Sequence, residues 1–262
     1  MKKQILLAVA ILALGAGSAY AAAGAGSGVL GSVHDMRNAA TVGATDFDGN
    51  NRVCAFCHTP HHAQTNVNAD DYYPLWSRQL DTNTFDPYRS ATINAVDYAA
   101  DIAVGPTRLC MSCHDGSIAP DQHYGRAGAA TKLTDDSFGH AGIGFLDAAA
   151  GTGNGLTNDH PVGFNYNDVA AGPAVNTSDV PGNTNVANKD NWIRSATGGT
   201  LVYKGNAANI SVQSRLYQDQ YMTCATCHDV HNRKNVSSGE TANYLVLAPQ
   251  SDSQLCLTCH IK

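Results

Sequence analysis

Eight cysteines and four of the eleven histidines form one short pattern that occurs four times. Each copy reads Cys, two residues, Cys, His, and the copies are Cys54/Cys57/His58, Cys110/Cys113/His114, Cys224/Cys227/His228 and Cys256/Cys259/His260. This spacing is the attachment signature of c-type heme. Two thiols three positions apart can both bond one edge of a porphyrin, and the adjacent histidine can ligate the iron. The sequence therefore predicts four covalently attached hemes and leaves no cysteine for a disulfide.

Paired cysteines also occur in zinc ribbons and in redox-active dithiols, which use thiolates without a porphyrin. In this chain, histidine follows every pair immediately. That feature favours heme attachment over both alternatives.

The beginning of the chain predicts export. Lys2 and Lys3 precede an apolar run from Ile5 to Leu14, and the small-residue segment Ala19–Ala21 resembles a cleavage site. This three-part pattern is typical of a secretory signal peptide, so we expect residues 1–21 to be removed. No later run approaches the roughly 18 apolar residues of a membrane span. We expect an exported protein without a membrane span, extracellular or at the cell surface, or alternatively periplasmic.

The composition favours loops over long regular elements. Only Glu240 among the 22 acidic residues is glutamate, and the chain has 25 glycines; aspartate and glycine prefer turns and caps to helix interiors. We predict a loop-rich fold with little regular secondary structure, in which short α-helices and a few short β-strands wrap around four covalent hemes. Because few aromatic residues are available, the porphyrins are expected to serve as the core, and the chain should stay largely unfolded without them.

The charge of the chain argues against nucleic acid as a partner. The formal net charge of −6 becomes −8 when Lys2 and Lys3 are removed, and no basic patch is visible.

The four motifs fall into two alternating types. The first and third, CAFCHTPH and CATCHDVH, each have another histidine three residues after the motif histidine; the second and fourth, LCMSCH and LCLTCH, do not. This repeat predicts a single tetraheme domain over residues 22–262, built as two diheme modules with a long loop-rich insert between them. The modules cover about residues 34–120 and about residues 158–262.

Four more histidines are needed if two histidines are to ligate every iron. Outside the motifs the chain has His34, His61, His62, His123, His140, His160 and His231. Three residues of chain span at most about 10 Å, so His61 cannot pass round the porphyrin rim to the heme of His58. The same limit applies to His231 and the heme of His228.

The simplest assignment keeps each pair of ligands within one module. His61 then pairs with His114, and His231 pairs with His260. His34 and His160 lie ahead of the two modules and are assigned to the remaining hemes. An exposed or hydrogen-bonded imidazole is the alternative for all four, and it fits His62, His123 and His140 better. Methionine can also ligate heme iron, but Met36 and Met222 are interpreted as packing residues.

Several longer strings resemble one family. VCAFCHTPHHA, YYPLWSR, LCMSCHDGSIA and NDHPVGFNY are similar to segments of tetraheme c-type cytochromes of the doubled-CxxCH kind, which include OmcE-type extracellular cytochrome nanowire subunits. The resemblance covers His34 to His260, with little in residues 122–157 and 168–220. It implies closely spaced hemes and head-to-tail assembly into a homopolymer, with one axial histidine from the neighbouring subunit. His34 is the candidate donor, because a flexible small-residue arm precedes it.

Three functions remain open. The favoured one is an extracellular filament subunit that conducts electrons to external acceptors, since head-to-tail contacts that do not close generate filaments. The second is a soluble, monomeric periplasmic tetraheme shuttle between membrane quinol oxidation and outer-surface acceptors, with other redox cytochromes as partners. The third is a multiheme reductase of a small substrate such as nitrite. A reductase needs an open coordination position on a metal, and no motif has lysine in place of histidine. We therefore expect an electron-transfer protein with no catalytic residue, not an enzyme.

Overall fold

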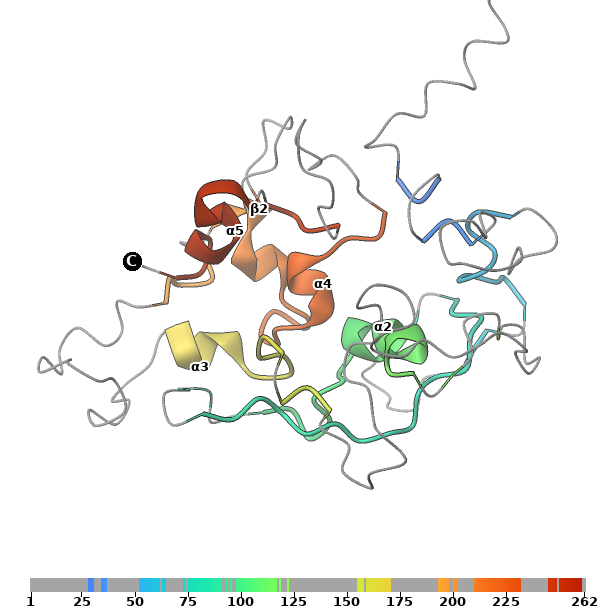
Figure 1. Ribbon diagram of the computed structural model, residues 1–262, viewed down its shortest axis with the longest axis horizontal. Helices are drawn as coiled ribbons and strands as arrows, with labels where there is room; N and C mark the ends of the chain where they lie inside the picture. Colours follow the sequence, from blue (N-terminus) through green and yellow to red (C-terminus); the bar gives the residue numbers. More distant parts are fainter. Residues whose placement is uncertain are drawn as a thin grey trace, which may run out of the picture.

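The fold has little regular secondary structure (Figure 1). The computed structural model describes residues 28–30, 34–36, 52–61, 63–64, 73, 75–90, 93, 95, 98–116, 118, 122, 155–157, 159–170, 193–197, 200–201, 210–231, 245–248 and 250–260. Its elements are the helices α2 (Pro106–His114), α3 (Tyr166–Ala170), α4 (Cys224–Cys227) and α5 (Gln254–Leu257), the 3-10 helices η3 (Val212–Arg215) and η4 (Ser251–Ser253), and the antiparallel strands β1 (Thr200–Leu201) and β2 (Ile210–Ser211). The predicted loop-rich class is confirmed, whereas wrapping around heme stays a prediction. In these ranges no helix is long and apolar enough to cross a membrane.

Helix α2 carries the second CxxCH motif and begins at a position that requires glycine. Gly105 has a φ of 53°, and a Cβ there would lie 2.7 Å from the ring atom Cζ of Tyr217. Pro106 follows in the first turn, where the N–H that proline lacks would have no helical partner. The helix ends where the Asp115 N–H donates to the Met111 carbonyl oxygen.

The other motifs have shorter helical segments or none. Helix α4 is a single turn over the third motif, preceded by a hydrogen bond of 3.0 Å from the Thr223 N–H to the Thr226 hydroxyl. Helix α5 enters the fourth motif after two residues in the left-handed region, Asp252 and Ser253. The first motif forms turns.

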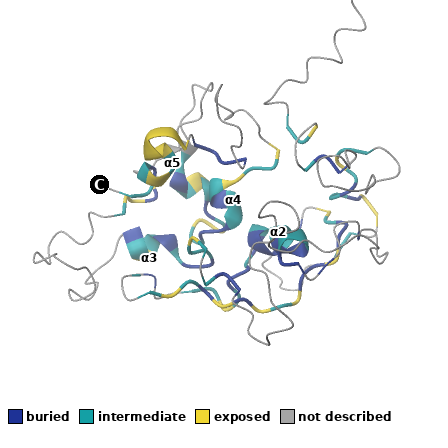
Figure 2. Ribbon diagram, viewed as in Figure 1, coloured by how far each residue is buried: buried dark blue, intermediate teal, exposed yellow. Residues whose placement is uncertain are grey.

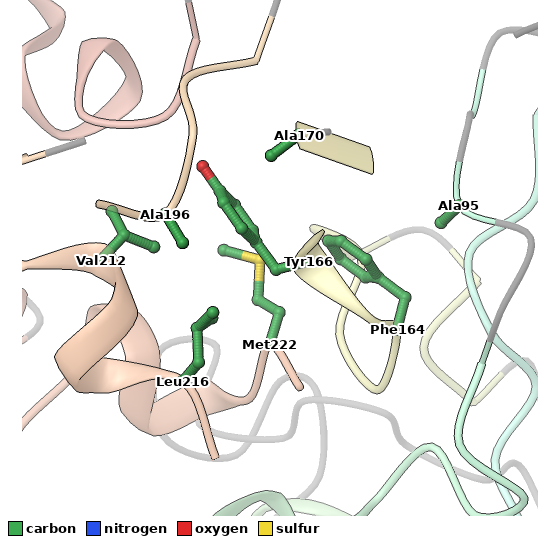
Figure 3. Packing of buried hydrophobic residues seen from close by; sticks show 8 residues of the cluster. All are labelled: Ala95, Phe164, Tyr166, Ala170, Ala196, Val212, Leu216 and Met222. Carbon is green, nitrogen blue, oxygen red and sulfur yellow. The ribbon is translucent and has the colours of Figure 1, made fainter. Parts of the chain in front are cut away.

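One cluster of buried apolar side chains, which we term the apolar core, lies mainly in the second half of the chain (Figure 3). It consists of Ala95, Phe164, Tyr166, Ala170, Ala196, Val212, Leu216 and Met222. Tyr166 also donates a hydrogen bond of 2.9 Å to the Arg194 carbonyl oxygen. Side chains therefore form part of the core, which the sequence interpretation had assigned to porphyrins. The packing role predicted for Met222 is confirmed.

A second buried group, which we term the polar core, includes residues of α2, a helix that Figure 2 shows as partly buried. It consists of Ser77, Arg78, Asp81, Thr107, Arg108, Ser112 and Asp115. Arg108 donates to the carbonyl oxygens of Asp81 at 2.6 Å and Asn83 at 3.0 Å, and it forms an ion pair with Asp101. Burial, with the nearby Asp115 carboxyl adding to it, raises the pKa of Asp81 to about 7.

The two halves of the chain pack against each other. Helix α2 contacts α4 (Figure 1), and the Cys224 N–H donates to the Thr107 hydroxyl at 3.2 Å. Tyr98 and Phe164 form an isolated antiparallel bridge, with their ring centres 6.3 Å apart. Most of the predicted insert lies outside the described residues.

Candidate functional site

Each CxxCH motif closes one helical turn. The backbone N–H of the motif histidine donates to the carbonyl oxygen of the first cysteine of the motif. The distances are 3.0 Å for His58, 3.0 Å for His228 and 2.8 Å for His260. His114 lies within α2. A turn of 3.6 residues brings both cysteines and the histidine to neighbouring positions on one surface.

The first and third motifs are also held by equivalent return segments, residues 75–77 and 245–247. The motif histidines form isolated bridges with the middle residue of each segment, His58 with Trp76 and His228 with Val246. All equivalent positions differ by the same offset of 170 residues (58 to 228, 76 to 246).

The hydrogen bonds of the two return segments match one by one. Thr59 N–H donates to Leu75 O at 2.7 Å, and its equivalent Asp229 N–H donates to Leu245 O at 2.9 Å. Ser77 N–H donates to Cys57 O at 2.9 Å, and its equivalent Leu247 N–H donates to Cys227 O at 2.8 Å. Both leucines have a positive φ, 53° and 57°. The repeat that the motifs predicted therefore extends to segments about 20 residues further along the chain.

Three histidines outside the motifs face motif histidines. The ring centres are 6.0 Å apart for His34 and His114, 6.1 Å for His58 and His231, and 6.5 Å for His160 and His260. A metal–imidazole bond of about 2.0–2.1 Å, with about 1.1 Å more to the ring centre, separates two rings on opposite sides of one metal by roughly 6.3 Å. The spacing of all three pairs therefore fits two axial imidazoles on one iron.

The predicted pairing of these histidines is wrong. His114 lies beside His34 and not His61, and His260 lies beside His160 and not His231. His231 lies beside His58, in the other half of the chain. The short segment of chain between a motif histidine and the histidine three residues later excluded ligation only of the heme of that same motif. The His58–His231 pair joins the two halves of the chain, which the packing of α2 against α4 brings together.

His61 is placed differently from the other three. His61 is exposed, and its backbone carbonyl oxygen accepts a hydrogen bond from the Thr59 hydroxyl. Within the described ranges the ring of His61 contacts no other ring. The structure therefore does not bring His61 to a motif histidine. His62, His123 and His140 lie outside the described residues.

Neighbouring oxygen atoms orient two of the outer histidines. The Nδ1 atom of His231 lies 3.5 Å from Oδ1 of Asp229, and this carboxylate raises the pKa of His231. The Nδ1 atom of His160 is 3.1 Å from the Pro161 carbonyl oxygen. Because a carbonyl oxygen only accepts, Nδ1 of His160 must carry the proton, which leaves the Nε2 lone pair available for a metal.

His34 is held in its neutral form. Burial, and then the adjacent His114, lower the pKa of His34 to about 4. The neutral imidazole is the form that binds a metal.

Cysteines of consecutive motifs are neighbours. Burial and then the Cys113 sulfur raise the pKa of Cys57 to about 12, and burial and then the Cys259 sulfur raise the pKa of Cys227 to about 12. A hydrogen bond between the thiols of Cys110 and Cys224 raises the pKa of Cys110 and lowers that of Cys224. Each of the first three motifs therefore has at least one cysteine thiol close enough to a thiol of the next motif to change its pKa.

Three arginines that the sequence interpretation missed donate to carbonyl oxygens of the motif loops. The bonds are Arg78 Nη2 to Ser112 O at 3.0 Å, Arg215 Nη2 to Ala225 O at 2.8 Å, and Arg194 Nε to Leu257 O at 3.0 Å. Arg78 belongs to the YYPLWSR string, but no spacing rule marks any of the three.

The described residues include no group of three or more His, Cys, Asp or Glu side chains arranged to hold a bare metal ion. A scan against protein-family models found no match to the chain, and a search of curated proteins found no match either. Interpretation of the site therefore depends on its own residues and their geometry.

Proposed function

We propose that the chain is a c-type cytochrome with four covalently attached hemes, and that it transfers electrons and catalyses no reaction. The observation that carries this proposal is the set of three facing histidine pairs, each with one CxxCH histidine and a ring separation of 6.0 to 6.5 Å. Four copies of a heme attachment signature supply the matching cysteines.

Each motif would hold one heme through its two cysteines and its histidine. The two cysteines would bind the heme through thioether bonds, and at the first, second and fourth motifs the motif histidine and the outer histidine beside it would ligate the iron. Each bound heme would supply a one-electron Fe(III)/Fe(II) couple. At these three motifs two imidazoles would leave no open position for a substrate, and this supports electron transfer over a reductase.

The order of the motifs supports a continuous path. Cys57 and Cys113, Cys110 and Cys224, and Cys227 and Cys259 bring the attachment edges of consecutive motifs together. Closeness of consecutive attachment sites is what electron transfer from one heme to the next requires.

The resemblance favours an extracellular filament subunit built as a head-to-tail homopolymer. One observation favours the alternative, a monomeric periplasmic shuttle that exchanges electrons with other redox cytochromes. In the single chain, His34 lies beside His114, so this pair can close without a histidine from a neighbouring subunit.

The intact mass of the exported protein tests heme attachment. We expect the mature chain plus four hemes, with a ferric spectrum that is low spin because two histidines ligate each iron. A different heme number, or a large high-spin fraction, would count against the proposal.

Electron microscopy of the extracellular fraction separates the two locations. Ordered thin filaments made of this chain would support the filament subunit. Only monomers in the periplasmic fraction would support the shuttle.

A further inference from the structure

Two equivalent loops of this chain differ at one buried position. The return segments 75–77 and 245–247 form the same hydrogen bonds to the first and third motifs. The next residue is Arg78 in the first segment and Ala248 in the second, at the same offset of 170 (78 to 248), and each is 1% exposed. A guanidinium in one loop thus corresponds to a methyl group in the other.

Arg78 lies between the first and second motifs. Its guanidinium is 5.3 Å from the centre of the Phe56 ring, which belongs to the first motif. Nη2 donates to the Ser112 carbonyl oxygen of the second motif at 3.0 Å, and Nη1 donates to the Gln122 carbonyl oxygen at 2.5 Å. The position of the side chain is therefore fixed by both motifs.

The positive charge lies close to the sulfur atoms of both motifs. Phe56 and Ser112, which Arg78 contacts, directly precede Cys57 and Cys113 in the sequence. In the loaded protein these sulfurs are the thioether atoms at the edges of the two porphyrins.

A cation beside a heme favours the reduced iron, because the oxidised iron carries one more positive charge. The interaction is strong where water is excluded and is screened where the cation is exposed. Near the second motif the buried carboxylate of Asp115 acts in the opposite direction. The clearest effect of Arg78 is therefore expected at the first motif.

We propose that Arg78 raises the reduction potential of the heme at Cys54 and Cys57 above that of its counterpart at Cys224 and Cys227. This inference rests on the proposed function. It adds that the two equivalent heme sites differ in reduction potential, with the first motif higher than the third. Arg78 acts through its charge and touches neither axial ligand.

The third and fourth motifs have weaker versions of the same contact. Arg215 donates to Ala225 O at 2.8 Å and to His228 O at 3.4 Å, but it is only half-buried, and Arg194 is exposed. Screening by solvent predicts that the influence on potential falls from Arg78 to Arg215 to Arg194.

Spectroelectrochemical titration of the exported four-heme protein tests the proposal. Arg78→Gln keeps amide donors for the Ser112 carbonyl oxygen but removes the charge, and we expect one component of the titration to move to lower potential. Arg78→Lys keeps the charge and should restore that component. Arg194→Gln is the matched control and should move its component least.

The outcomes separate this inference from the proposed function. Four unchanged potentials in a fully loaded Arg78→Gln protein would overturn the role of Arg78 and leave electron transfer intact. A wild-type protein that carries no heme would overturn the proposed function itself. If Arg78→Gln does not assemble, Arg78→Lys still decides: a potential close to wild type supports the charge effect, and a potential as low as that of the third-motif heme refutes it.

Discussion

The apolar core and the polar core are built on different principles within one chain. In the apolar core, Phe164, Tyr166 and Met222 bury carbon against carbon. In the polar core, Arg78 and Arg108 are buried guanidinium groups whose donors end on backbone carbonyl oxygens. The apolar core should therefore respond to lost volume, and the polar core to lost charge and to pH.

The largest effect is expected from Phe164→Ala. It leaves a cavity in the apolar core and should lower the free energy of unfolding of the heme-loaded protein by about 3–5 kcal/mol. Denaturant unfolding at two salt concentrations measures this loss, which should not depend on salt. Phe164→Leu is the control and should cost much less; equal losses would mean that volume does not decide stability here.

Arg108→Met should be nearly as damaging, for a different reason. It removes the donors to the Asp81 and Asn83 carbonyl oxygens and leaves Asp101 without its buried partner. We expect a loss of about 2–4 kcal/mol, since methionine fills the space but cannot donate. Exposed Arg89 is the control, and Arg89→Met should stay within about 0.5 kcal/mol of wild type. Similar losses for both variants would contradict the importance of burial.

The raised pKa of Asp81 predicts that stability depends on pH through the polar core, an effect that the apolar core lacks. Its pKa of about 7 in the folded protein lies above the usual value of about 3.9. Between pH 4 and 7 the unfolded chain releases a proton that the folded chain keeps, so the contribution of Asp81 to stability falls as pH rises through this window.

Asp81→Asn removes that contribution. At pH 8 it should exceed wild type in free energy of unfolding by about 1–3 kcal/mol, and the gain should disappear near pH 4. Measurement of both proteins from pH 4 to 8 cancels the other titrating groups. Parallel curves would show that Asp81 titrates normally.

The smallest effect is expected at Ser77, the position equivalent to Leu247. The Ser77 hydroxyl donates to the Phe56 carbonyl oxygen in a fully buried site. Ser77→Ala should cost about 1 kcal/mol in unfolding free energy. Val212→Ala, at a buried site in the apolar core, serves as a reference for the loss of carbon alone; no loss in Ser77→Ala would mean that the hydroxyl is dispensable.

Local patterns predicted much of this molecule. The composition predicted a loop-rich fold, and the alternation of motif types predicted a repeat that the hydrogen bonds of Leu75 and Leu245 extend. The structure places His34, His160 and His231 beside motif histidines but not His61, and the assignment of all four as heme ligands stays a prediction.

The remaining features depend on contacts between distant segments. The His58–His231 pair joins the two halves of the chain, and no spacing along the chain encodes the packing that brings them together. Burial of Arg78 likewise depends on Phe56 and Ser112 from two other segments. Helix α3 was missed because five residues are too few to show a helical period.

The hydrogen bond between Cys110 and Cys224 bears on the order in which the protein is made. Folding without heme would place these two thiols side by side, and in the oxidising compartment that the proposed export implies, disulfides form readily. A disulfide there would consume one attachment sulfur from each of two motifs. Under the proposed function, heme attachment at the second and third motifs would therefore have to precede the docking of α2 on α4.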